Sequence, residues 1–131
     1  MHFFIVIPVF NGGDKITRTI ESLRAQSALA EGTARLSVLV MDGASTDDTC
    51  ARVAALDDPR IEIVSAPDGG MYDALARGLA RTAGDVTGYL PAGEALDPHA
   101  FAVSAEVFTR YPDIAWITGQ EVTRNAAGQI I

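Results

Sequence analysis

The sequence predicts an α/β fold, a Rossmann-like three-layer α/β/α sandwich with a mostly parallel sheet. Short apolar runs alternate with amphipathic stretches of helical length along the 131 residues, which is typical of βαβ units. The first run, 3–9, is almost continuously apolar, as expected for a strand that is buried on both faces. Because 48% of the residues are hydrophobic, one domain of this length can bury a core without disulfides.

Strands are expected where short apolar runs end in turn-forming residues. These runs are 3–9, 36–41, 61–64, 86–90 and 114–118. Trp116 lies in the last run and is expected in the core. Residues 121–124 and 129–131 resemble the two arms of a hairpin around 125–128. Right-handed crossovers between consecutive strands would then place helices on both faces of the sheet.

The first two helices are indicated by apolar spacing and by capping residues. The first helix begins at Asp14, and the second is capped by Ser45 or Thr46. Asp47 and Asp48 would lie in the first turn of the second helix, where the helix dipole favours acids. The residues expected to face inward are Ile16, Ile20 and Leu23 in the first helix and Cys50, Val53 and Leu56 in the second.

Two further helices complete the alternation. One is expected over 71–83, and Pro98 opens the other at the position that proline favours. The residues expected to face inward are Leu75 and Leu79 in the former and Phe101, Ala105 and Phe108 in the latter.

Charge and cysteine content exclude several classes of protein. The net charge is −7, which argues against a nucleic-acid binder, since that function needs a basic face. The single cysteine cannot form an internal disulfide. No apolar run is long enough for a transmembrane segment, and the N-terminus does not resemble a signal peptide. We therefore expect a cytoplasmic protein, with peripheral attachment at the inner membrane left open.

Polar residues gather directly after the predicted strands. The segments concerned are 8–13, 42–48, 67–73 and 91–94. In parallel sheets a ligand binds beyond the carboxyl ends of the strands. The last three segments carry carboxylates, which repel one another unless a cation or a hydrogen-bond donor is bound. Each segment alone is also an ordinary turn or helix cap. Only their occurrence together indicates a ligand-binding site.

Taken together, the segments resemble the nucleotide-sugar-binding part of the inverting glycosyltransferases of family 2, which have the GT-A fold. The resemblance is carried by FIVIPVFN at 4–11, SLRAQS at 22–27, DGASTDDT at 42–49 and SAPDGGMYDA at 65–74. It implies that 1–131 is a single domain of this kind, apparently truncated at the C-terminal side. The segment that carries the family's catalytic base is not recognised, so the catalytic residues stay unknown.

The resemblance also assigns residues to donor binding. These are Pro8, Phe10, Asn11, Asp42, Ser45, Asp68, Asp73 and Gly93. Pro8 and Phe10 would line the base pocket, and Asp42 would accept a hydrogen bond from the base. In the family an acidic pair after the fourth strand holds Mg²⁺ or Mn²⁺. Here Gly93 and Glu94 stand at those two positions, so the divalent metal would rest on Glu94 alone.

The implied reaction is transfer of a sugar from a nucleotide diphosphate sugar, most simply a UDP-sugar, to an acceptor hydroxyl with inversion. The setting would be polysaccharide or glycoconjugate synthesis. The alternative is a catalytically inactive, degenerate domain that binds a nucleotide or serves as a scaffold. A sugar nucleotidyltransferase is disfavoured, because no glycine-rich loop with basic residues follows the first strand. An uncovered sheet edge would favour a homo-oligomer.

Overall fold

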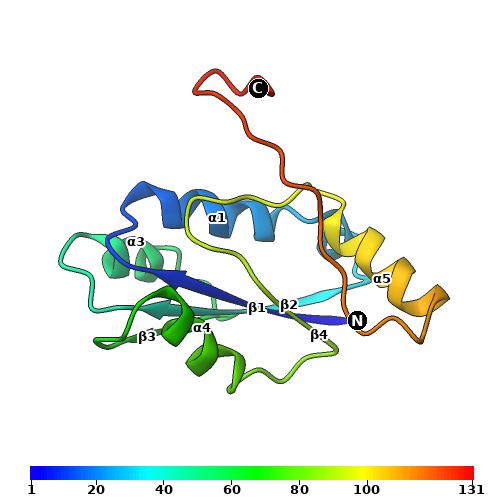
Figure 1. The fold of residues 1–131 in the computed structure, drawn as a ribbon, viewed down its shortest axis with the longest axis horizontal. Coiled ribbons are helices and arrows are strands. Elements are labelled where there is room, and N and C mark those ends of the chain that lie inside the picture. Colours follow the sequence, from blue (N-terminus) through cyan, green and yellow to red (C-terminus); the bar gives the residue numbers. More distant parts are fainter.

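The computed structural model describes residues 1–131 and consists of a four-stranded sheet between two layers of helices (Figure 1). The elements are β1 His2–Val9, α1 Asp14–Arg24, α2 Ser27–Ala30, β2 Arg35–Asp42, α3 Thr49–Ala55, β3 Ile61–Ser65, α4 Met71–Leu79, β4 Val86–Tyr89 and α5 Ala100–Arg110. In Figure 1, α1 and α3 lie on one side of the sheet and α4 lies on the other. The expected α/β sandwich is thereby confirmed.

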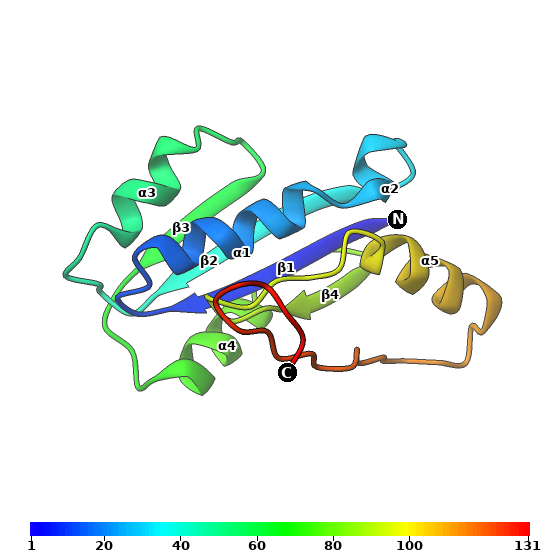
Figure 2. The same ribbon diagram turned by 90° about the horizontal axis from the view of Figure 1, so that it is seen from above.

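The strand order is β3-β2-β1-β4, and every neighbouring pair is parallel. The chain moves outward from β1 to β3 and then returns to the far side of β1, so the order reverses between β1 and β4 (Figure 2). Val9 pairs with Asp42, and Asp42 pairs with Ser65. Because the ends of β1, β2 and β3 are in register, the segments that follow them leave the sheet at one edge.

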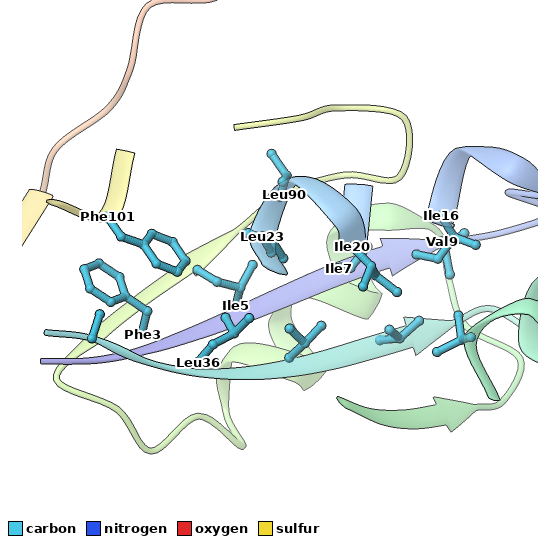
Figure 3. Close-up of a cluster of buried hydrophobic side chains, with 14 of the residues drawn as sticks. Phe3, Ile5, Ile7, Val9, Ile16, Ile20, Leu23, Leu36, Leu90 and Phe101 are labelled. Carbon is cyan, nitrogen blue, oxygen red and sulfur yellow. The ribbon is translucent and has the colours of Figure 1, made fainter. Parts of the chain in front are cut away.

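The larger core lies between the sheet and the layer of α1, α3 and α5. Alternate residues of β1, among them Phe3 and Ile7, pack there against α1 residues such as Ile20 (Figure 3). Phe101 of α5 stacks on Phe3 with ring centroids 4.1 Å apart. The intervening β1 residue Val6 faces α4 on the other side. This alternation is what a central strand with two covered faces requires.

The second helix does not begin where the sequence predicted. Neither Ser45 nor Thr46 caps α3, which begins at Thr49 after Asp48. The Ser45 hydroxyl donates instead to Asp42, and the Thr46 N–H donates to the Asn11 side chain. These groups are engaged in loop contacts, so Asp47 and Asp48 precede the helix rather than occupy its first turn.

The helix expected over 71–83 ends earlier, at Leu79. Arg81 N–H bonds to Gly78 C=O at 3.0 Å, which is the i to i+3 spacing of a tightening last turn. Gly78 faces β1 so closely that a Cβ there would lie 2.5 Å from Val6 Cγ1. This contact turns Leu79 away from the sheet, and Leu79 is 39% exposed rather than inward-facing.

Two smaller features also differ around the last helix. α5 begins at Ala100 instead of Pro98, because Ala100 N–H closes a turn onto Asp97 C=O at 3.0 Å. The four-residue helix α2 was not predicted, since it is too short to show an apolar period. None of the helices is long and apolar enough to cross a bilayer.

The prediction of a fifth strand over 114–118 is wrong. These residues pair with no strand, and Trp116 is 75% exposed rather than in the core. Beyond α5 the chain leaves the body of the molecule (Figure 1), so the apolar run meets neither a ladder partner nor a helix. The expected hairpin is present only as a turn closed by one antiparallel bridge, between Arg124 and Ile130.

Candidate functional site

Asn11 joins the loop after β1 to the loop after β2, residues 43–48, called the post-β2 loop here. The Asn11 side-chain oxygen accepts the N–H of Thr46 at 2.8 Å and that of Asp47 at 3.3 Å. The Asn11 N–H donates to Ser45 Oγ at 2.8 Å. Asn11 has a φ of 49°, a left-handed conformation that asparagine tolerates better than most residues. Asn11 and Ser45, both predicted for the site, are therefore brought together.

Thr49 adds a second link between the same two loops. Its hydroxyl accepts the N–H groups of Gly12 at 2.9 Å and Gly13 at 3.1 Å, and it donates to Asp47. Thr49 was not among the residues predicted for the site. The signal was present, because Thr49 is the last residue of the DGASTDDT stretch.

Asp42, at the end of β2, is only 2% exposed and is surrounded by donors. It accepts hydrogen bonds from the hydroxyls of Ser45 and Ser65, from Ser45 N–H at 3.0 Å and from Cys50 Sγ at 3.3 Å. Burial alone would raise the pKa of the Asp42 carboxyl, but these hydrogen bonds outweigh it and hold the pKa below its ordinary value. The buried carboxylate is therefore charged at neutral pH.

Cys50 is half-buried beside Asp42 rather than part of the core, so that prediction is wrong. Desolvation, followed by the hydrogen bond to Asp42, raises the pKa of the Cys50 thiol. The thiol stays protonated and acts as a donor to Asp42.

A hollow of about 220 Å³ opens between β2, β3 and α4. Its lining combines apolar walls with charged groups: Met41, Asp42, Val64, Ala66, Asp68, Ala74, Arg77 and Arg81. Asp68 accepts Gly70 N–H at 2.9 Å, and a Cβ at Gly43 would lie 2.9 Å from Asp68 Oδ2. A side chain at position 43 would therefore displace the Asp68 carboxylate from its present place. Two predicted site residues, Asp42 and Asp68, meet at this hollow.

Asp73 lies in the first turn of α4 and binds within its own segment. It accepts Gly69 N–H at 2.8 Å and forms an ion pair with Arg77 at 3.0 Å. Its present contacts thus fix the turn that leads into α4.

The loop after β4, residues 90–99, is called the post-β4 loop here and runs back along α1 (Figure 1). Its backbone is held by α1 side chains: Gly93 N–H donates to Thr19 Oγ1 at 2.9 Å, and Thr19 Oγ1 donates to Glu94 C=O at 2.7 Å. Gln26, immediately after α1, donates to Asp97 C=O at 2.8 Å and accepts Phe101 N–H at 2.9 Å. Gln26 belongs to the SLRAQS stretch, and this structural role was not predicted from it.

Phe10 and Pro8 are placed differently although both were predicted to line the base pocket. Phe10 projects from the end of β1 and is 65% exposed. Pro8 is buried within β1, where its carbonyl accepts Ala92 N–H at 3.4 Å. Since the β1–β4 ladder ends at Tyr89, the N–H that proline lacks is not needed there.

The residues after β4 do not form a resident metal site. Gly93 supplies no side-chain ligand, and Glu94 is a single exposed carboxylate. No group of three or more His, Cys, Asp or Glu side chains in the chain is placed to hold an ion. Mg²⁺ is usually held by one or two carboxylates together with substrate phosphates and waters, and positions 93 and 94 offer one carboxylate, Glu94, where the sequence resemblance implied two. That Glu94 helps to hold a divalent metal therefore stays a prediction.

Comparison with known proteins identifies what this fold resembles. The profile described as glycosyl transferase family 2 matches residues 4–126. Chondroitin synthase of Pasteurella multocida is 27% identical over 129 residues, which cover 97% of this chain and 13% of that protein. The chain spans 7% to 29% of the lengths of the curated relatives it matches.

Solved structures agree with the family profile. Staphylococcus aureus TarS 1-349 in complex with UDP-GlcNAc superposes with a TM-score of 0.76 at 18% identity, over 95% of this chain and 37% of that one. Glucosyl-3-phosphoglycerate synthase of Mycobacterium tuberculosis, solved with Mn²⁺ and UDP, gives a TM-score of 0.55 at 30% identity, over 81% and 38% of the two chains. The GT-A architecture expected from the sequence is confirmed.

Proposed function

This chain belongs to glycosyl transferase family 2, and we propose that it binds a nucleotide diphosphate sugar, as a UDP-sugar, across the carboxyl edge of its sheet. The observation that carries the proposal is the convergence of four sequence-distant segments at that edge in the order β3-β2-β1-β4. Ligands of open parallel sheets bind where the strand order reverses, which here is between β1 and β4.

The dimensions of this edge suit a nucleoside diphosphate. The hollow beside Asp42 lies at β2 and β3, whereas the switch point lies between β1 and β4. Neighbouring strands are about 4.8 Å apart, so the two places are separated by roughly 10 Å. A base in the hollow and a diphosphate at the switch point would therefore belong to one ligand.

Three side chains would recognise the nucleoside. Phe10 offers an exposed ring for stacking, and base stacking on an aromatic side chain contributes about 1–3 kcal/mol. Asp42 borders the hollow, and its Oδ1 receives only the Ser45 hydroxyl, which leaves an acceptor position for a base N–H. Asp68 lines the same hollow and can accept from the ribose.

Calorimetric titration with UDP, UDP-GlcNAc and GDP tests donor binding directly. Phe10→Ala should weaken binding of the preferred nucleotide about tenfold, because the stacking surface is removed. Tyr111→Ala is the matched control, since it removes another exposed ring at the end of α5. If both variants bind the nucleotide equally well, Phe10 does not contact the base.

Within this proposal, the chain is the donor-binding part of an enzyme that transfers the sugar to an acceptor hydroxyl with inversion, in polysaccharide or glycoconjugate synthesis. The loss of an acidic side chain at Gly93 favours the second candidate, a domain that binds the nucleotide without turning it over. Hydrolysis of the donor sugar separates the two: a measurable rate supports the enzyme, whereas tight binding without turnover supports the inactive domain.

We also propose a cellular location and an oligomeric state for the protein. We place the protein in the cytoplasm, and cell fractionation tests this. Residues 112–131 carry exposed apolar side chains, among them Trp116, Ile130 and Ile131, which would favour self-association. Light scattering at rising protein concentration should show an oligomer, and a strictly monomeric species would contradict it.

A further inference from the structure

We propose that the ammonium group of Lys15, rather than a metal ion, holds the diphosphate of the nucleotide sugar beside Gly93. This inference rests on the proposed donor binding and adds to it the group that neutralises the phosphate charge. The reason is that the family has a pair of acidic metal ligands after the fourth strand, whereas this chain has Gly93 and Glu94 at those positions.

The aliphatic stem of Lys15 lies in van der Waals contact range of position 93. A Cβ at Gly93 would lie 3.5 Å from Lys15 Cδ and 3.9 Å from both Lys15 Cβ and Cγ. The φ of Gly93 is +103°, a conformation that a residue with a side chain rarely adopts. The backbone conformation therefore favours glycine at 93, and the lysine stem lies beside it.

Lys15 also lies at the switch point of the sheet. It follows the loop after β1, and that loop packs on the post-β4 loop, since a Cβ at Gly12 would lie 3.6 Å from Ala92 Cβ. Ala92 N–H bonds to Pro8 C=O at 3.4 Å. Lys15 and Gly93 thus lie beyond the carboxyl ends of β1 and β4, where the strand order reverses and a ligand is expected.

The charge of Lys15 is available for a ligand. Lys15 is exposed and forms no ion pair, whereas the arginines of α3 and α4 nearest this edge are paired: Arg52 with Asp48, and Arg77 with Asp73. The chain has a net charge of −7, and the edge also carries Glu94. A diphosphate there needs a positive partner, and lysine binds phosphate as a point charge.

A metal ion and Lys15 would compete for the same place. Two cations a few ångströms apart repel each other, so a lysine beside Gly93 disfavours the ion that an acidic side chain there would hold. Gly93 and the Lys15 stem would together form a site that supplies its own positive charge instead of binding a cation.

Titrations of UDP and of uridine in the presence of EDTA test this role. Lys15→Gln should weaken UDP binding about tenfold while uridine binding changes less than about twofold. Lys15→Arg should restore most of the UDP affinity, because it keeps the positive charge. Arg18→Gln is the matched control, since it removes an exposed, unpaired cation from the next turn of α1. Rising salt should weaken UDP binding to the wild type more than to Lys15→Gln.

Two results would overturn the inference and leave donor binding intact. One is a Lys15→Gln variant that binds UDP as tightly as the wild type. The other is wild-type binding of UDP that disappears in EDTA and returns with Mn²⁺. If the wild type binds neither UDP nor uridine with or without Mn²⁺, the proposed function itself fails, and the role of Lys15 fails with it.

Discussion

The post-β2 loop and the post-β4 loop are both fixed by hydrogen bonds. In the first the loop's own side chains make these bonds, and in the second the side chains of a neighbouring helix make them. The post-β2 segment uses its own side chains: Ser45 binds Asp42, and Asp47 and Thr49 bind each other and the loop after β1. The post-β4 loop contributes mainly backbone groups, and the side chains that hold it belong to Thr19, Ser22 and Gln26 in and just after α1.

This difference means that the two loops should tolerate changes of their own side chains to different degrees. A loop held by its own side chains cannot change them without losing its shape. A loop held through its backbone can exchange an acid for Gly93 and still keep its path along α1. The chemistry of the post-β4 loop is therefore free to change, as the proposed role of Lys15 requires.

The largest expected effect comes from removing the support of the post-β4 loop. Gln26→Leu leaves the buried Phe101 N–H without its partner, whereas Asp97 C=O keeps the N–H of Ala100, and Gln26 itself is fully buried. Each buried polar group that loses its bond costs about 1–3 kcal/mol, so the free energy of unfolding should fall by about 3 kcal/mol in urea denaturation. Gln129→Leu, at an exposed position, is the control. Equal stability of the two variants would show that α1 does not hold this loop.

A smaller effect is expected from the side chains that hold the post-β2 loop. Asn11→Ala removes the acceptor of Thr46 and Asp47 N–H and places alanine at a φ of 49°. The free energy of unfolding should fall by about 2 kcal/mol. Asn11→Gly loses the same acceptor but tolerates the left-handed conformation, so it should be more stable than Asn11→Ala by about 1 kcal/mol. The reverse order would mean that backbone strain plays no part.

Acid should loosen the post-β2 loop before the post-β4 loop. The pKa of Asp42 is below its ordinary value of 3.8 in the folded protein, so its stabilising effect is complete above that pH and is lost as the pH falls below it. The bonds from Thr19 and Gln26 involve neutral groups and do not titrate. Amide-exchange protection, measured relative to the intrinsic exchange rate at each pH, should be lost first at Ser45 as the pH falls below 3.8, and simultaneous loss of protection in both loops would contradict this.

The smallest effect is expected at Glu94, whose side chain makes no hydrogen bond or ion pair while its backbone carbonyl binds Thr19. Glu94→Ala should change the free energy of unfolding by less than about 0.5 kcal/mol, as a typical exposed substitution does. Urea denaturation measures this. Thr19→Val is the informative partner, because it removes the hydroxyl that bonds to Gly93 and Glu94. A large loss of stability in Glu94→Ala would contradict this, because it would mean that the Glu94 carboxylate itself stabilises the loop.

Local patterns in the sequence determined the four strands, the order of the main helices and the turn residues after each strand. The run 3–9, for example, is apolar at every position because β1 is covered on both faces. The stretch at 42–49 was recognisable because its side chains bind one another within a few residues.

Only the tertiary structure decided which groups hold the post-β4 loop, that Lys15 lies beside Gly93, and that 114–118 is not a strand. Gln26 and Phe101 are 75 residues apart, and no periodicity relates them. Trp116 is apolar in a strand-like run, yet no partner strand lies within its reach. Hydrophobic pattern specifies which residues avoid water, but the surface that covers them and the polar partners they meet depend on how distant segments pack.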